Sequence, residues 1–188
     1  MTRAARRLGN RGVSAIEAAF ALPAVAIFAV GLFEFGRVLA VDNLLDHAAQ
    51  AVSRAGVTGQ APPPGMTREQ QLARLVGDRT FGLVDPATLE VEMVSYESFP
   101  VVRQPEPFID LDGDGRWGAG EPFTDVNGNG QWDPDQGRPG SGRGGEVVLY
   151  AIRYADKPMT GLMAAVLGVQ EFRYEARAAV RNEPFGGR

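Results

Sequence analysis

The sequence predicts an α+β fold, in which a long N-terminal helix packs on a small antiparallel sheet that carries an acidic insertion. Three observations lead to this prediction. An apolar segment near the N-terminus passes into an amphipathic one without a break, three later segments alternate as strands do, and a glycine-rich acidic repeat separates the first two of those segments. About 130 of the 188 residues follow the helix, enough for one domain with its own core.

The N-terminal segment has the charge pattern of a membrane anchor. Four arginines precede Gly12, and sixteen uncharged residues separate Glu17 from Glu34. With the residues on either side, this stretch approaches the ~20 residues that a bilayer requires. The arginines of the leader are Arg3, Arg6, Arg7 and Arg11. Because positive charge favours the cytoplasmic side, we expect a single pass with the N-terminus in the cytoplasm and the C-terminal domain outside it.

Past Arg37 the apolar residues recur at steps of three and four, so the helix is expected to continue to about Ala55 and to end at Gly56. The residues predicted for its apolar face are Leu39, Leu44, Leu45, Ala48, Val52 and Ala55. The helix, assigned to residues 13–57, therefore has a membrane-spanning half and an amphipathic half that packs on the sheet. His47, the single histidine, is expected at a surface or interface because no second histidine or cysteine could complete a metal site with it.

Four stretches of the first third resemble the TadE-like pseudopilin or minor pilin family of tight-adherence (type IVc-like) pilus systems. These stretches are RGVSAIE, the ALP at 21–23, GLFEFGR at 31–37 and AAQAVSRAG at 48–56. The resemblance implies a pilin-like fold, a bacterial inner-membrane location, and pilin and pseudopilin subunits as partners, with incorporation into a surface pilus open. It also implies that a prepilin peptidase removes leader residues 1–12 by cutting after Gly12. Val13 would then carry the new amine, and Glu17 would pair in lipid with the amine of a neighbouring subunit.

A plain signal anchor is the alternative for this segment. In that case Gly12 is only a linker residue and Glu17 only marks the membrane boundary, as charged residues at helix ends often do.

The rest of the chain, residues 66–188, is predicted to form an extracytoplasmic α+β domain. The proline-rich stretch 60–65 precedes a short amphipathic helix at about 68–79, for which Thr67 offers an N-cap. Strands are expected at 89–98, 146–155 and about 169–181, with a short apolar helix or loop at 159–167. Their order in the sheet cannot be derived from the sequence.

The insertion, residues 106–143, contains a calcium-loop motif. The string DLDGDGRWGAGE at 110–121 satisfies D-x-D-x-D-G-x5-E, in which carboxylates and one carbonyl coordinate the ion. Asp110, Asp112, Asp114 and Glu121 would supply carboxylate oxygens, and Arg116 would supply its carbonyl oxygen. Oxygen ligands in this number favour Ca²⁺ over transition metals.

The motif recurs fifteen residues later, because FTDVNGNGQW repeats FIDLDGDGRW. The counterparts in the second copy are Asp125, Asn127, Asn129 and Gln131. Its twelfth position is Gln136, so Asp133 or Asp135 would have to provide the missing charge. One Ca²⁺ is expected and a second is allowed. An acidic, glycine-rich disordered loop is the alternative, but disorder does not explain the repeated ligand order or the phased aromatic residues.

Catalysis and nucleic-acid binding find no support in the sequence. There is no nucleophile elbow, phosphate loop or histidine constellation, and the arginines near the C-terminus alternate with glutamates as on a solvated face. We therefore expect a protein that is not an enzyme. Two classes remain: a minor pilin or pseudopilin that takes part in pilus assembly, and a single-pass membrane-anchored, calcium-dependent adhesion or ligand-binding module that enters no filament.

Overall fold

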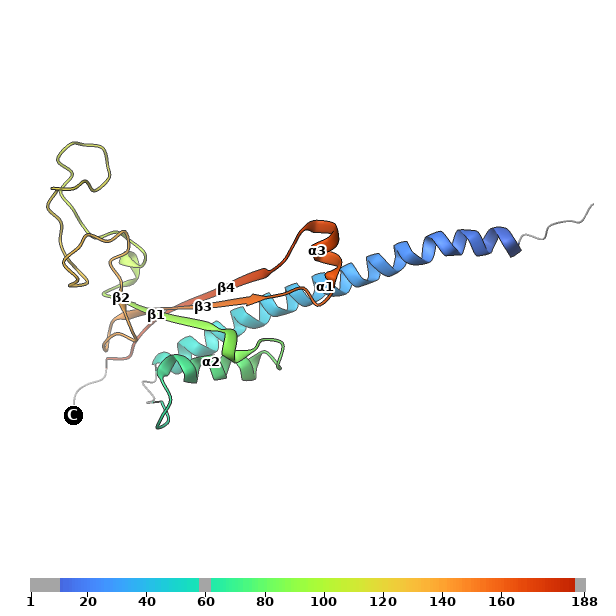
Figure 1. Cartoon of the computed structure of the whole chain (residues 1–188). Helices are drawn as coiled ribbons and strands as arrows, with labels where there is room; N and C mark the ends of the chain where they lie inside the picture. The colour runs from blue at the N-terminus through green and yellow to red at the C-terminus, as the bar shows by residue number, and fades with distance from the viewer. Residues whose placement is uncertain (1–10, 58–61, 185–188) are drawn as a thin grey trace, which may run out of the picture. The chain divides into compact units, whose positions relative to one another are not determined.

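The computed structural model describes residues 11–57 and 62–184 (Figure 1). It divides into two compact units. Among the described residues, unit 1 is made of residues 11–40 and 156–172, and unit 2 is made of residues 41–57, 62–155 and 173–184. The fold is α+β, as predicted, with a long N-terminal helix and a four-stranded antiparallel sheet.

Helix α1 spans Arg11–Val57 and contributes to both units. It continues through Pro23, as membrane helices often do, and ends two residues beyond the last predicted apolar position at Ala55. Gly56 lies where the helix meets the sheet. A Cβ atom at this position would be 1.9 Å from the Tyr150 hydroxyl, so only glycine allows the helix to approach the sheet so closely.

The core of unit 2 lies between the outer part of α1, helix α2 and the sheet. Leu45, Ala48 and Val52 are buried, as the amphipathic pattern predicts, and Tyr150 and Ile152 of the sheet are fully buried. Leu39 departs from the predicted apolar face because it is 46% exposed. Among the described residues, the buried apolar residues of α1 therefore begin at Val41.

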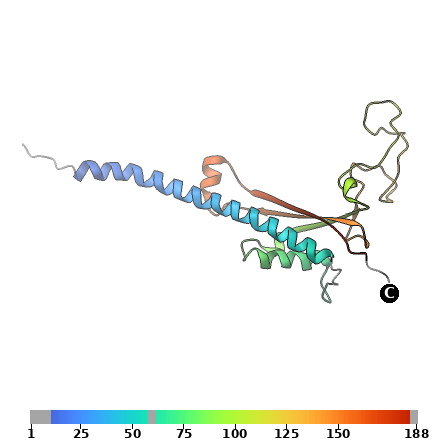
Figure 2. The same cartoon turned by 180° about the vertical axis from the view of Figure 1, so that it is seen from behind.

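The sheet, seen from behind in Figure 2, has the strand order β2-β1-β3-β4. Its strands are β1 (Glu90–Tyr96), β2 (Arg138–Pro139), β3 (Val147–Asp156) and β4 (Phe172–Arg181). Strands β1 and β3 pair antiparallel, with Glu90 opposite Arg153 and Tyr96 opposite Val147. The three longer strands match the predicted ones. The two residues of β2 are too few to show an alternating pattern, and the proline suits the edge of the sheet that β2 occupies.

Helix α2 spans Arg68–Arg79, as predicted. Thr67 caps it by accepting a hydrogen bond from the backbone N–H of Gln70, whose side chain accepts one in return from the backbone of Thr67. This reciprocal pair is a capping box, which satisfies two of the N–H groups left free at a helix start. Short 3-10 helices follow at Pro86–Thr88 and Phe99–Val101.

Unit 1 contains the N-terminal part of α1 and a short helix, α3, at Gly161–Leu167. Of the segment 159–167, predicted as a short helix or a loop, residues 161–167 are thus helical. Thr160 is the N-cap of α3, and Gly168 ends it in the left-handed conformation with φ of 69°.

Candidate functional site

The N-terminal half of α1 exposes its apolar side chains. Phe20 is 80% exposed, Phe28 71% and Leu22 66%, with many further apolar residues of this half in the same state. This half of α1 is long and apolar enough to cross a membrane. Gly12 and Val13 lie in the first turn of the helix, one turn before Glu17.

Two glutamates of α1 have opposite surroundings. Glu34 is 1% exposed, and its carboxylate accepts hydrogen bonds from the backbone N–H of Met159 at 2.6 Å and the hydroxyl of Thr160 at 3.3 Å. Glu17 is exposed and forms no hydrogen bond or ion pair with any other residue that the structure describes. Glu34 is therefore satisfied within unit 1, whereas Glu17 has no such partner among the described residues.

The insertion is closed at its neck by two backbone hydrogen bonds. The N–H of Glu106 donates to the carbonyl of Asp133 at 3.0 Å, and the N–H of Gln136 donates to the carbonyl of Gln104 at 2.9 Å. The Gln136 side chain also donates to the carbonyl of Pro105, so it belongs to the neck and not to the second loop. Residues 106–136 thus form a closed double loop, visible beyond β2 in Figure 1.

The two copies of the repeat face each other, and each contact from the first copy to the second has an equivalent from the second to the first. Phe108 and Phe123 form an antiparallel bridge. Ile109 N–H donates to the Pro122 carbonyl at 2.8 Å, and the equivalent Thr124 N–H donates to the Pro107 carbonyl at the same distance. Equal bonds between equivalent residues indicate that the copies are related by a local pseudo-twofold axis.

The aromatic residues of the repeat pack between the copies. The Trp117 and Trp132 rings stack with centroids 5.2 Å apart. Each tryptophan also meets the phenylalanine of the other copy edge to face, Trp117 with Phe123 at 6.0 Å and Trp132 with Phe108 at 6.1 Å. This small aromatic cluster explains why the phenylalanines and tryptophans recur in phase, and such aromatic pairs stabilise beyond their buried area.

Each loop is closed by the glutamate that begins the other copy. Glu121 accepts from the N–H groups of Leu111 and Gly118, both at 2.7 Å. Glu106 accepts in the same way from Val126 at 2.7 Å and Asp133 at 3.1 Å. Glu121 was predicted as an ion ligand, and the structure places its carboxylate on these backbone donors.

Glu106 is the functional residue that the sequence analysis missed. It is fully buried. Its carboxylate closes the second loop as that of Glu121 closes the first, because the twelfth position of the second loop is Gln136, which has no carboxylate. The signal was present in the sequence, because EPF occurs at both 106–108 and 121–123. Extending the repeat by two residues toward the N-terminus would have shown it.

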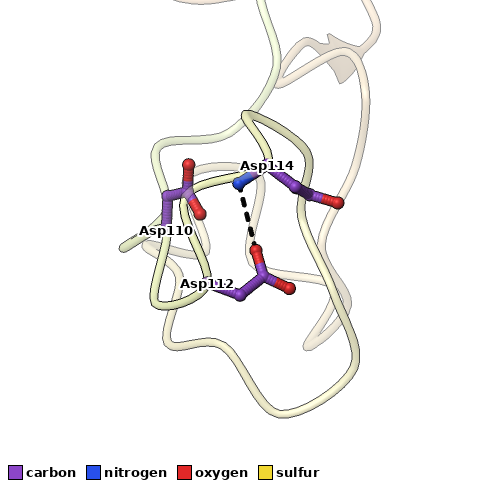
Figure 3. Close-up of side chains that lie close together, drawn as sticks. All are labelled: Asp110, Asp112 and Asp114. Carbon is purple, nitrogen blue, oxygen red and sulfur yellow. Dashed lines mark hydrogen bonds between the residues drawn. The ribbon is translucent and has the colours of Figure 1, made fainter.

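The first loop brings Asp110, Asp112 and Asp114 together (Figure 3). One carboxylate oxygen from each lies within 4.8 Å of the others. Asp110 accepts from the N–H groups of Gly113 and Gly115, and these bonds hold the pKa of its carboxyl below the usual value. Asp112 accepts from the N–H of Asp114, the bond drawn in Figure 3.

The second loop repeats this backbone pattern with amides in place of two carboxylates. Asp125 accepts from Gly128 and Gly130, as Asp110 does from Gly113 and Gly115. The amide groups of Asn127 and Asn129 both donate to the carboxylate of Asp133. Asp133 therefore lies in the second loop, where it supplies a negative charge.

The remaining predicted ligands lie as follows. The N–H of Arg116 donates to Asp114 at 2.7 Å, and the N–H of Gln131 donates to Asn129 at 2.7 Å. Asp135 lies outside the second loop, where it accepts from the Tyr96 hydroxyl at 2.9 Å. Burial of the ring, together with this hydrogen bond, raises the pKa of Tyr96 well above its usual value.

The three aspartates of the first loop are exposed, and their spacing could hold a metal ion. Calcium binds oxygen at about 2.3–2.6 Å, so two ligands on opposite sides of one ion are about 5 Å apart. The three aspartate oxygens meet that condition. Three exposed carboxylates this close repel one another, and an ion between them would replace the repulsion with coordination.

The fold, the exposed apolar half-helix and the paired acidic loops define a candidate membrane-anchored α+β protein. The model of the TadE-like protein family matches residues 12–54, which is most of α1. This match suggests a protein associated with a tight-adherence pilus. No curated protein and no solved structure matches the chain.

Proposed function

We propose that this chain is a minor pilin or pseudopilin that takes part in the assembly of a tight-adherence, type IV-like pilus or its envelope machinery. The observation that carries the proposal is the match of the TadE-like family model to α1. Along the matched stretch, the apolar side chains are exposed in the first half of the helix and buried in the second. Such a helix suits a subunit whose first half lies in a membrane and whose second half packs in a folded outer domain. The proposed location is the bacterial inner membrane, with the N-terminus in the cytoplasm.

The assembly step would use the first turns of α1. A prepilin peptidase would cut after Gly12, so that the amine of Val13 and the carboxylate of Glu17 become available in lipid. An unpaired carboxylate there is costly, which favours contact with the amine of a neighbouring pilin or pseudopilin subunit. The absence of a described partner for Glu17 within its own chain supports this role.

Replacing Glu17 by alanine tests the assembly step. We expect Glu17→Ala to be produced at the normal level but to lose co-purification with the other pilus subunits. Asp46→Ala is the matched control, because Asp46 is also an exposed acid on α1 but lies in the half that packs on the sheet. Equal co-purification of both variants would contradict the proposal and would favour a membrane-anchored module that enters no filament.

The outer domain would be stabilised by Ca²⁺ in the first loop, with a weaker second site in the other loop. Three aspartates meet in the first loop, whereas two asparagines take their places in the second. Bound Ca²⁺ would neutralise the carboxylates and stiffen the double loop. The folded core of unit 2 lies elsewhere, in α1, α2 and the sheet, so the effect should be confined to the insertion.

Both tryptophans of the chain lie in the double loop, so tryptophan fluorescence reports on it directly. We expect Ca²⁺ to raise the melting temperature seen by fluorescence, while far-ultraviolet circular dichroism, which follows α1 and the sheet, changes less. Asp112→Asn should abolish the tighter binding event in titration calorimetry, and Asp85→Asn, outside the insertion, should leave it intact. Calorimetry without heat at millimolar Ca²⁺ would contradict the calcium proposal alone.

A further inference from the structure

Helix α3 is an exposed apolar element that the proposed function does not use. No charged residue lies between Lys157 and Glu171, the segment that contains α3. Within it Met159 is 63% exposed, Val166 63% and Leu167 65%. Isolated exposed apolar residues are ordinary, but an uncharged segment with several of them marks a contact surface.

The segment before α3 is tied to α1 within unit 1. Both carboxylate oxygens of Glu34 are used, one by the backbone N–H of Met159 and one by the hydroxyl of Thr160, the N-cap of α3. Arg37, three residues further along α1, forms an ion pair with Asp156. These two ties hold the start of α3 against α1 at the level of Glu34.

That level is the outer end of the proposed membrane span. The stretch of α1 from Ser14 to Phe33, which is uncharged apart from Glu17 near its start, is about 30 Å long at 1.5 Å per residue, close to the thickness of the hydrocarbon core. Glu34 is the next residue, so it would lie at the outer boundary of the hydrocarbon. A buried, doubly hydrogen-bonded carboxylate is the form in which an acid is tolerated there.

Helix α3 runs across α1 rather than alongside it, as both views of unit 1 show (Figures 1 and 2). When α1 crosses a bilayer, α3 would therefore lie along the membrane surface. At about 10 Å, its seven residues are too short to cross, and an apolar helix tied at this depth meets the region between headgroups and acyl chains.

We propose that α3 and the residues just before it form a second membrane contact, which inserts Met159, Val166 and Leu167 into the outer interface of the bilayer that α1 crosses. The proposal rests on the proposed function only in requiring that α1 cross the membrane. Because the segment has no charge, insertion depends on apolar burial and not on anionic lipid. Glu34 acts as the tie that sets the depth of α3.

Three leucines with nearly equal exposure allow a matched test. Leu22 in α1 is 66% exposed, Leu167 at the end of α3 65% and Leu111 in the double loop 68%. The chain has no cysteine, so each leucine can be replaced singly by cysteine and labelled with an environment-sensitive fluorophore. The full chain is placed, one copy per disc, in phosphatidylethanolamine–phosphatidylglycerol nanodiscs that carry quenchers at shallow or deep positions of the acyl chain.

We expect the label at Leu167→Cys to be quenched most by the shallow quencher, at a depth of about 5–10 Å below the headgroups. The label at Leu22→Cys should be quenched most by the deep quencher, and the label at Leu111→Cys by neither. Replacing phosphatidylglycerol by phosphatidylcholine should leave the Leu167 result unchanged.

The outcomes separate the two proposals. Quenching at position 22 without quenching at 167 would overturn the α3 contact and leave the membrane span intact, with a second copy of the chain as the remaining cover for α3. Quenching at neither position would overturn the span itself. Quenching at 111 as well would show that the label, and not α3, seeks the lipid.

A second measurement tests the tie. Glu34→Ala in the Leu167→Cys chain should reduce quenching at 167 and leave the signal from Leu22→Cys unchanged, because α1 still spans. Asp46→Ala should change neither signal. Undiminished quenching at 167 in the Glu34→Ala chain would overturn the role of Glu34.

Discussion

The two halves of α1 share one helix but solve opposite packing problems. In the N-terminal half, side chains such as Phe20 and Leu22 are exposed, whereas Leu45 and Val52 in the second half are buried against unit 2. Secondary structure is the same throughout, so the difference lies in what surrounds the helix. The first half needs an apolar environment from outside the chain, and the second half has one already.

Introducing a charge into each half should have the largest and most unequal effect. Leu45 is 1% exposed, so Leu45→Asp would bury an unpaired carboxyl group. Burying even a neutral polar group without a partner costs about 2–7 kcal/mol, so this change should unfold unit 2. Leu22→Asp should leave the melting temperature of the outer domain unchanged and lower the share of the chain found in membranes. Melting curves in detergent and membrane fractionation measure the two effects. Similar melting curves for both variants would contradict the claim that the two halves of α1 have different surroundings.

Two glycines of α1 allow a second comparison, because a Cβ atom would clash at Gly56 and would meet nothing at Gly36. Gly56→Ala would place a Cβ atom against the Tyr150 hydroxyl and should destabilise unit 2 by about 1–3 kcal/mol. Gly36→Ala meets nothing within 4 Å and should be neutral or should stabilise the helix by up to about 1 kcal/mol. Chemical denaturation of the two variants gives the free energies of unfolding, and a loss at Gly36 as large as at Gly56 would contradict the packing described here.

The smallest effect concerns pH at the sheet that the second half of α1 packs against. Glu175 lies between Arg177 and Arg153, and its hydrogen bond with Arg177 lowers the pKa of its carboxyl below the usual value of 4.5. A lowered pKa stabilises the fold above pH 4.5, and this contribution is lost as the pH falls through the lower folded value. The pair is partly exposed, so we expect at most about 1 kcal/mol.

Melting temperatures of wild type and Glu175→Gln at pH 7 and pH 3 check this expectation. The difference between the two proteins should shrink toward pH 3, where the carboxyl of the wild type is protonated. A constant difference would show that the ion pairs contribute nothing measurable. Neither half of α1 holds Glu175, so membrane association should not change.

Much of the fold follows from patterns that repeat over several residues. Helix α2 and its cap at Thr67 were predictable because a capping residue and an apolar side coincide. The three longer strands show their alternation over seven to ten residues each. Strand β2 was not predictable because two residues have no period, and Leu39 was assigned to the wrong environment because periodicity gives the face of a helix but not where its cover begins.

The candidate site was partly predictable for the same reason. The motif placed Asp110, Asp112 and Asp114 together, but it could not show that each loop borrows a glutamate from the other copy, since that exchange depends on how the copies face each other. The pairing of Glu34 with the start of α3 joins residues 125 positions apart and leaves no local signal.

The N-terminus of the mature chain tests the central claim, that the exposed half of α1 is a prepilin helix, most directly. Mass spectrometry of the full-length protein, produced in cells that hold the matching prepilin peptidase, should find Val13 as the first residue. A chain that keeps residues before Gly12 under these conditions would contradict the claim and would leave α1 as a plain membrane anchor.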